Sequence, residues 1–519
     1  MTTGDATAPN PRFDPPGPGR WEALADHFPR PLTPEYQTIL QTGFVEGYAP
    51  VCARYGLPLR TILLRLVHGH VYIRPQALVG GDRALPAPPH AVAVAFFRLI
   101  PTMRRAARQA ERAIDERRWL AEADEWRDRT RPEAIRRNRA LQSVAVDELD
   151  AAALAEHLRE CRDNAIAGYR QHFELHGTDL LPTGILLVRG RAWAIDPGEL
   201  LALLTGHSPA TTSTVLDDDT RWRSATGYDL DAKTYGELPD LETHLRRRPP
   251  PRSEPPDDAE VALRARVPAA ERDEFDRLLA DARATYGVRD DNGAILGAWT
   301  IGLLRRAMLA AGRRLRLLDP EHAVELTVDE LVARLTGHNE PSAADAAARA
   351  AARAALASFA APPFLGPEEA LPPVGALPRS MALLTAAILI FRELNATAVA
   401  ESGLQGTGIG SRTVVGRAVV AHDPNDAILR LEPGDVLVTP FTTPAYNVAL
   451  SYAGGVVVVE GGTVSHAAVI ARELDLPAVI GVRDAMTIAD GAVVELDPVA
   501  GTIRELPTTV TAAAATPRQ

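Results

Sequence analysis

The spacing of apolar residues divides the chain into a long helical part and a shorter part rich in strands. Between about Ala91 and Asp179, apolar positions recur every three or four residues amid dense charge, which predicts amphipathic helices. From about Glu401, short runs such as "GDVLVTP" and "GGVVVVEGG" are separated by Gly, Pro and Asp, which predicts strands. Only "NVALSYA" and "SHAAVIARELDL" in this part have helical patterning. We expect a mainly α-helical domain followed by a small β-rich α/β domain of roughly 100 residues, a common domain size.

Proline-rich segments suggest where the domains end. The stretch "APPFLGPEEALPPVGALPRS" has the composition of an extended linker, whereas "LRRRPPPRSEPPDD" reads as an exposed loop within the helical part. Near the start of that part, "HVYIRP" predicts a short strand that Pro75 stops. The expected organisation is a disordered leader at 1–20, a helical domain at 21–360, a Pro-rich linker and helix at 361–400, the β-rich domain at 401–508 and a disordered tail at 509–519.

Bulk composition narrows the class of protein. A net charge of −11 over 519 residues disfavours nucleic acid as a partner, because phosphate binding needs a basic face. The chain has no uninterrupted apolar run long enough to cross a bilayer, and its start lacks the basic and apolar segments of a signal peptide. Two cysteines fit a reducing compartment and exclude a metal cage made of cysteines alone. These features favour a cytoplasmic protein without a membrane partner.

The candidate chemistry lies in "GGTVSHAAVIARELDLPAVIGV". Gly461 and Gly462 permit a tight turn after a strand, and Ser465 is a good helix N-cap. His466 then falls in the first helical turn, where unpaired backbone N–H groups favour an anion. A neutral imidazole there can attack phosphorus, and the same N–H groups would stabilise the phosphoimidazole, with the hydroxyls of Thr463 and Ser465 nearby.

Local physics leaves two simpler interpretations of this stretch open. A capped helix with a histidine near its start is common and need carry no chemistry. A metal site is less favoured, because His422 is the only other histidine of this domain and no carboxylate pair stands at ligand spacing near His466.

The same residues resemble the phosphohistidine swivelling domain of phosphoenolpyruvate-utilising enzymes, the family of phosphoenolpyruvate synthase, pyruvate phosphate dikinase and rifampin phosphotransferase. The signature residues stand at Gly461, Gly462, Ser465, His466, Ala467, Ala468, Ala471, Arg472, Glu473, Leu474, Pro477, Ala478, Val479 and Gly481. The flanking stretches "PGDVLVTPFTTPAY" and "DGAVVELDPVAGTI" resemble a strand with a Thr-x-Pro turn and the closing hairpin of that domain. The resemblance covers roughly 402–506 and implies that His466 carries a phosphoryl group.

The helical part is similar, more loosely, to the substrate-binding domain that lies between the ATP-binding and histidine domains of rifampin phosphotransferase-like proteins. Stretches such as "WEALADHFPRPLTP" and "LLRRAMLAAGRRL" carry this likeness over most of 21–337. It supports the domain order and leaves the substrate open.

The resemblance also implies parts that this sequence does not show. The relatives carry an ATP-grasp domain at the N-terminus, and some carry a C-terminal barrel, but here no P-loop and no counterpart of either domain is found. We therefore expect no cofactor bound by this chain alone. A separate ATP-grasp protein holding ATP and Mg²⁺ would phosphorylate His466 in trans.

The swivelling domain would then deliver the phosphoryl group to a hydroxyl or carboxylate of a small molecule. Phosphorylation could be the end product, as in antibiotic modification, or could prepare a leaving group in secondary metabolism. The alternative is a non-catalytic binding or regulatory protein that retains the swivel fold.

The helical domain offers candidates for the acceptor pocket and its general base. They are His68, His70, His172, His176, His207 and Arg289. The first two would share one face of a strand, the next two are spaced i, i+4 on a helix, the fifth lies in a loop and the last precedes two aspartates at a helix end. Packing, half-burial or a solvated helix end are the simpler roles for each, and no metal site is expected.

Overall fold

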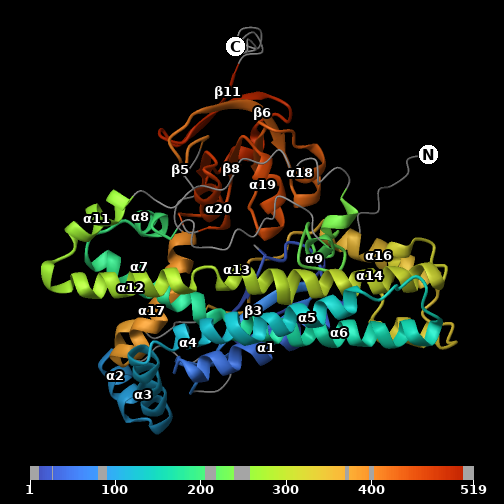
Figure 1. The fold of residues 1–519 in the computed structure, drawn as a ribbon, viewed down its shortest axis with the longest axis horizontal. Coiled ribbons are helices and arrows are strands. Elements are labelled where there is room, and N and C mark those ends of the chain that lie inside the picture. The colour runs from blue at the N-terminus through green and yellow to red at the C-terminus, as the bar shows by residue number, and fades with distance from the viewer. Residues whose placement is uncertain are drawn as a thin grey trace.

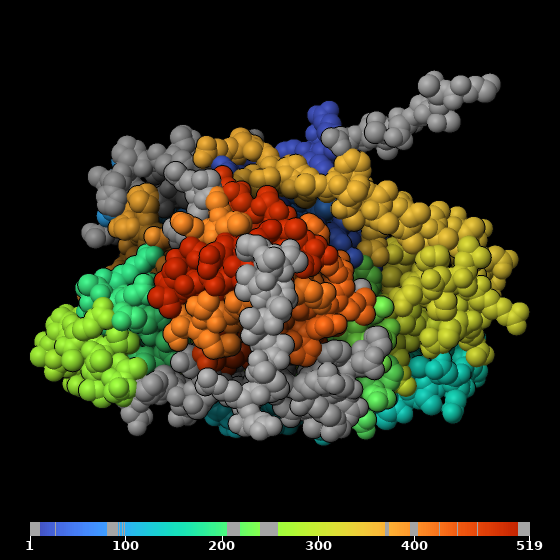
Figure 2. Space-filling view, turned by 90° about the horizontal axis from the view of Figure 1, so that it is seen from above, coloured from blue at the N-terminus to red at the C-terminus, as the bar shows by residue number. Residues whose placement is uncertain are grey.

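The computed structural model describes residues 11–25, 27–79, 90–204, 218–238, 257–368, 373–396, 403–463 and 465–506. A broad helical layer forms the base of the molecule, and a smaller domain built on a curled sheet is seated on it (Figure 1). Viewed from above, this smaller domain sits over the middle of the helical layer (Figure 2). The largely helical content and the curled mixed sheet are consistent with the expected fold class.

The helices of the larger domain have these bounds: α1 Pro34–Arg54, α2 His90–Leu99, α3 Pro101–Asp115, α4 Arg118–Glu125, α5 Arg131–Gln142, α6 Ala151–Glu174, α7 His176–Ala192, α8 Pro197–Ala202, α9 Asp218–Arg221, α11 Asp257–Arg266, α12 Arg272–Thr285, α13 Val288–Asn292, α14 Trp299–Arg314, α15 Val328–Leu335, α16 Ala343–Ala357 and α17 Arg379–Ala396. Helix α6 packs between α1 and α14, and α7 packs against α12 and α17. Apolar side chains between these helices form two large buried clusters.

A four-stranded sheet of order β2-β3-β1-β4 lies beside these helices. Its strands are β1 Trp21–Ala23, β2 Leu59–Val67, β3 His70–Ala77 and β4 Phe364–Leu365. The prediction that Pro75 stops the strand is wrong, because β3 continues to Ala77 with Pro75 opposite Ile62 of β2. On the other side β1 pairs only as far as Ile73, and proline is tolerated where one side of a strand is unpaired.

Parts of the expected leader and linker are integrated into this domain. Phe13 packs against the His70 ring, so the segment from residue 11 onward is placed, while 1–10 and 507–519 lie outside the described residues. Leu365 pairs with Trp21 across β4 and β1, and α17 buries Met381 in the helical core. The apolar positions of α17 explain this, because a helix with a buried face packs as core. Most of the loop expected at 245–258 is outside the described residues.

The smaller domain is built on a seven-stranded sheet of order β11-β10-β6-β7-β8-β9-β5. Its elements are β5 Thr407–Ile409, β6 Val414–Val420, α18 Pro424–Arg430, β7 Val436–Thr439, α19 Asn447–Tyr452, β8 Gly455–Val458, α20 His466–Leu474, β9 Ala478–Ile480, β10 Val493–Asp497 and β11 Thr502–Glu505. Strands β6 to β9 are parallel. Strands β10 and β5 pair antiparallel with β6 and β9 at the two ends of this group, and β11 pairs antiparallel with β10. Helix α18 was not expected from the sequence, since its seven residues are too few to show helical periodicity.

The two domains share a hydrophobic contact. Ala225 and Leu238 of the larger domain are buried in the same cluster as side chains of α19, α20 and the parallel strands. Helices α19 and α20 lie on the side of the sheet that faces the helical layer, above α13 (Figure 1). This packing brings the start of α20 towards the helical domain.

One helical run passes a length and composition test for crossing a membrane. It extends over Ala269–Arg314, and 78% of its apolar window is buried inside the protein. Such burial is typical of a core helix in a large domain.

A glycine contact tests the packing of α17 on α7. A Cβ atom added at Gly184 would lie 2.1 Å from the carbonyl oxygen of Ala387, whereas one at the exposed Gly375 would meet nothing within 4 Å. We expect Gly184→Ala to lower the free energy of unfolding by about 1–3 kcal/mol, because the helix backbones must separate. Gly375→Ala, the matched control, should stay within about 0.5 kcal/mol of wild type. Denaturant unfolding followed by tryptophan fluorescence measures both, and equal effects would contradict this packing.

Candidate functional site

The Gly-Gly-x-x-Ser-His stretch forms the tight turn and capped helix that its residues predict. Gly461 has a φ of 125°, a conformation that favours glycine, and a Cβ atom there would lie 2.9 Å from Ser465 Cβ. Ser465 is the N-cap of α20, and its hydroxyl accepts a hydrogen bond from the Ala468 N–H at 3.4 Å. His466 is therefore the first residue of the helix. The turn leaves its imidazole at the positive end of α20.

Two polar side chains of the same domain hold the imidazole. Nδ1 of His466 lies 3.0 Å from the hydroxyl of Thr442, and Nε2 lies 2.8 Å from the amide oxygen of Asn447. Both partners come from the segment that leads from β7 into α19. Their contact with the histidine was not expected from the sequence, although the flank "PGDVLVTPFTTPAY" contains Thr442 and ends directly before Asn447. The two contacts fix the orientation of the ring and leave each nitrogen facing a hydrogen-bonding group.

The histidine faces the helical domain. His466 is half-buried, and burial lowers its pKa to about 3, assisted by the positive charges of Arg289 and His27. Arg289 lies on α13 and His27 precedes α1, so both belong to the larger domain. An imidazole with this pKa is neutral near pH 7 and keeps a lone pair for attack.

A network of aromatic and polar side chains lies near Arg289. Nε2 of His172 and Nε2 of His176 are 3.2 Å apart, and the Tyr48 hydroxyl lies 2.5 Å from Nδ1 of His176. Nδ1 of His172 contacts the amide oxygen of Asn292. Burial lowers the pKa of His172 to about 4 and that of His176 well below its usual value, and Arg289 contributes to both shifts. The network joins α1, α6, α7 and α13.

Asp179 is a buried carboxylate beside the same arginine. Its side chain is 9% exposed, and Oδ2 lies 3.7 Å from Nε of Arg289. Among the described residues, Oδ1 of Asp179 has no hydrogen-bond partner. Burial raises the pKa of Asp179 to about 7, although the Arg289 charge acts in the opposite direction. A buried carboxylate with one oxygen near an arginine and the other without a partner marks a candidate functional group.

Arg472 links α20 to the helical domain. Its Nη1 donates a hydrogen bond to the Thr463 carbonyl at 2.7 Å, which ties the helix to the turn before it. Its Nη2 comes within 3.3 Å of the position that a Cβ atom on Gly198 would occupy, at the start of α8. The signature arginine therefore both orients α20 and contacts the opposing domain.

The other predicted pocket residues lie elsewhere. His68 occupies the turn between β2 and β3 with φ 51°, so the expectation that it shares a strand face with His70 is wrong. It is exposed, and its Nε2 lies 2.8 Å from the Arg12 carbonyl oxygen, while His70 is buried against Phe13. His207 falls outside the described residues. Within the described part of the chain, no three His, Cys, Asp or Glu side chains gather as a metal-binding group would.

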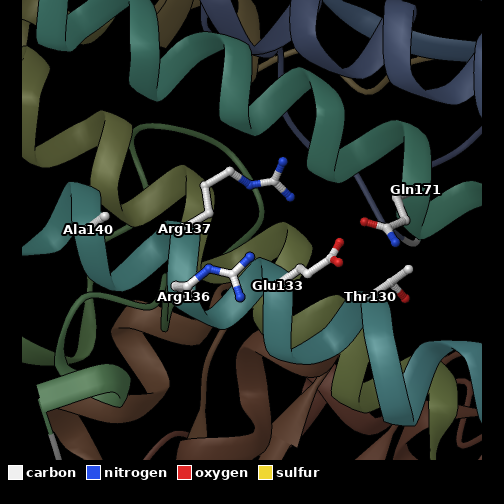
Figure 3. Close-up of a pocket in the computed structure, with 6 residues that line it drawn as sticks. All are labelled: Thr130, Glu133, Arg136, Arg137, Ala140 and Gln171. Carbon is white, nitrogen blue, oxygen red and sulfur yellow. The ribbon is translucent and has the colours of Figure 1, made fainter.

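A surface pocket of about 440 Å³ lies on the helical layer, between the segment 126–142 and α6 (Figure 3). Arg136, Arg137 and Glu133 line it together with Gln171. None of its lining residues belongs to the smaller domain or contacts His466. The charged groups around His466 therefore form a separate candidate site.

Comparison with known proteins identifies the smaller domain. Residues 431–501 match the family described as the mobile domain of PEP-utilising enzymes. Over 81 residues the chain is 46% identical to phosphoenolpyruvate synthase of Escherichia coli strain K12, covering 16% of this chain and 10% of that protein. Over 94 residues it is 45% identical to rifampicin phosphotransferase of Streptomyces sviceus, covering 18% of this chain and 11% of that protein.

A third relative extends beyond the smaller domain. Chondramide synthase cmdD of Chondromyces crocatus is 30% identical over 341 residues, which is 60% of this chain and 8% of that protein. The chain thus spans 8% to 11% of the length of these three relatives. Residues 431–501, which include the histidine signature, are therefore similar to the mobile domain of PEP-utilising enzymes.

Proposed function

We propose that this chain is a phosphotransferase component in which His466 carries a phosphoryl group to a small-molecule acceptor. The observation that supports this most directly is a neutral imidazole at the first residue of α20, in a domain of the PEP-utilising family. A lone pair on that ring can attack phosphorus, and the helix N-terminus favours the resulting anion.

Docking of the two domains supports delivery to the helical domain. His466 lies where the charge of Arg289 acts on it, and the same charge acts on His172 of the buried network. This placement corresponds to an acceptor-facing position, with the mobile domain seated on the helical layer (Figure 2). Charging of His466 would require the domain to turn away towards a donor, a rigid-body movement of the kind seen in domain swings.

The donor that we propose is ATP with Mg²⁺, held by an ATP-grasp domain on a partner protein. The sequence contains no GxxxxGK[ST] pattern that would form a P-loop. The acceptor is a hydroxyl or carboxylate of a small molecule. Antibiotic modification and secondary metabolism are the proposed settings, and a relative named rifampicin phosphotransferase is consistent with the first.

Intact mass measurement tests the carrier. We expect protein purified from its native host at mildly alkaline pH, or incubated with ATP and host extract, to gain one phosphoryl group, because phosphohistidine is stable under alkaline conditions. His466→Ala should not gain it. His422→Ala, which removes the exposed histidine of the same domain, is the matched control and should gain it as wild type does. Absence of the modification from wild type in both preparations would favour a non-catalytic binding protein.

The protonation state of His466 is a second expected outcome. Because its pKa is lowered to about 3, the ring should remain neutral from pH 8 to pH 5, and Arg289→Gln should raise the pKa by removing a nearby positive charge. Imidazole ¹⁵N resonances, assigned by their loss in His466→Gln, report this directly. The folded protein binds fewer protons than the unfolded chain between pH 6.5 and 3, so the stability from neutral His466 is lost as pH falls through this window. A titration midpoint of His466 near 6.5 would contradict the burial of its ring.

A further inference from the structure

We propose that Asp179 is the general base of the acceptor site and takes the proton from a neutral hydroxyl group that attacks phospho-His466. This inference rests on the proposed function and names the acceptor class as an alcohol or phenol. It assigns to Asp179 a role in the reaction that the sequence analysis sought among the histidines.

The burial of Asp179 is the first argument. The side chain lies on α7 and is 9% exposed, and its Oδ1 has no hydrogen-bond partner among the described residues. A buried carboxylate oxygen without a partner costs free energy that folding alone does not recover. A bound hydroxyl group would donate the missing hydrogen bond, and the same contact would place its proton on Oδ1.

The position of Arg289 is the second argument. Its Nε lies 3.7 Å from Asp179 Oδ2, and its charge also acts on His466. The guanidinium therefore lies near both the carboxylate and the phosphocarrier ring. There it can neutralise the phosphoryl oxygens during transfer while it orients Asp179.

The histidines are poorer bases than Asp179. Burial lowers the pKa of His172 to about 4, and its nitrogens are engaged by Asn292 and His176. Nδ1 of His176 is already engaged by the Tyr48 hydroxyl, which lies 2.5 Å away. The pKa of Asp179, by contrast, is raised to about 7, close to the value that suits a general base at neutral pH.

The transfer step balances without another reactant. The acceptor oxygen forms a bond to phosphorus while the bond between phosphorus and Nδ1 of phospho-His466 breaks. The N–P electron pair returns to Nδ1, and the ring leaves as a neutral imidazole because Nε2, which faces the Asn447 amide oxygen, keeps its proton throughout. The acceptor O–H proton passes to Asp179 and then to solvent after the phosphate ester leaves. A carboxylate acceptor is already ionised at neutral pH and would not need this base, so Asp179 favours a hydroxyl acceptor.

The test separates loading of His466 from its discharge. The full chain is loaded chemically with phosphoramidate, and loss of the phosphoryl group is followed by intact mass in water, in glycerol and in phenol. We expect Asp179→Asn to load as wild type does, which also shows that it folds, and to discharge at least about 100-fold more slowly with the preferred acceptor. Asp128→Asn, at an exposed carboxylate outside this site, is the matched control and should discharge at the wild-type rate.

The pH profile distinguishes a base from a structural carboxylate. Above its pKa of about 7 Asp179 is ionised, so the discharge rate of wild type should rise with pH through this value, and Asp179→Asn should lack the rise. Arg289 and Asp290 of α13 are the charged neighbours that set this pKa. Discharge of Asp179→Asn within twofold of wild type in all three acceptors would overturn the inference alone. Failure of wild type to load with phosphoramidate or with ATP and host extract would overturn the proposed function as well.

Discussion

The burial of one imidazole between two domains is the constraint on which the candidate site depends. His466 must remain neutral to act as a nucleophile, and burial against the helical domain ensures this by lowering its pKa to about 3. The same docking brings Arg289 near the ring. A phosphoryl group on His466 would lie near the positive charge of Arg289 only in the docked arrangement. Docking of the two domains therefore keeps the free imidazole neutral and also places phospho-His466 where its phosphoryl group would be transferred.

The helical domain gathers polar groups around Arg289 from several elements. Far apart in the sequence, they lie together in the fold: Tyr48 on α1, His172 on α6, His176 and Asp179 on α7, and Arg289 on α13. Buried polar groups that satisfy one another form a rigid network, and Oδ1 of Asp179 is one of several buried side-chain atoms of the described residues that lack a partner. Rigid helices hold such groups in place more accurately than loops do.

Local sequence determined the turn at the site better than it determined the surrounding elements. Two glycines, a serine N-cap and a histidine specify the strand–turn–helix through neighbouring residues alone, and the structure agrees with it. Strand β3 can continue through Pro75 because β1 pairs with it only as far as Ile73. The placement of the segment near Phe13 depends on contact with the His70 ring, which is far away in the sequence. Helix α18 was too short for its periodicity to be recognised.

The sequence by itself determined the helix that begins at His466 and the likeness to the mobile domain of PEP-utilising enzymes, because each depends on residues close together in the chain. It also proposed His172, His176 and Arg289 among several candidates without a reason to separate them from His68 and His70. Only the tertiary structure decided which of these lie together, since helix packing sets distances between residues more than a hundred positions apart. For the same reason, the unpaired oxygen of Asp179 could be recognised only once α7 and α13 were packed.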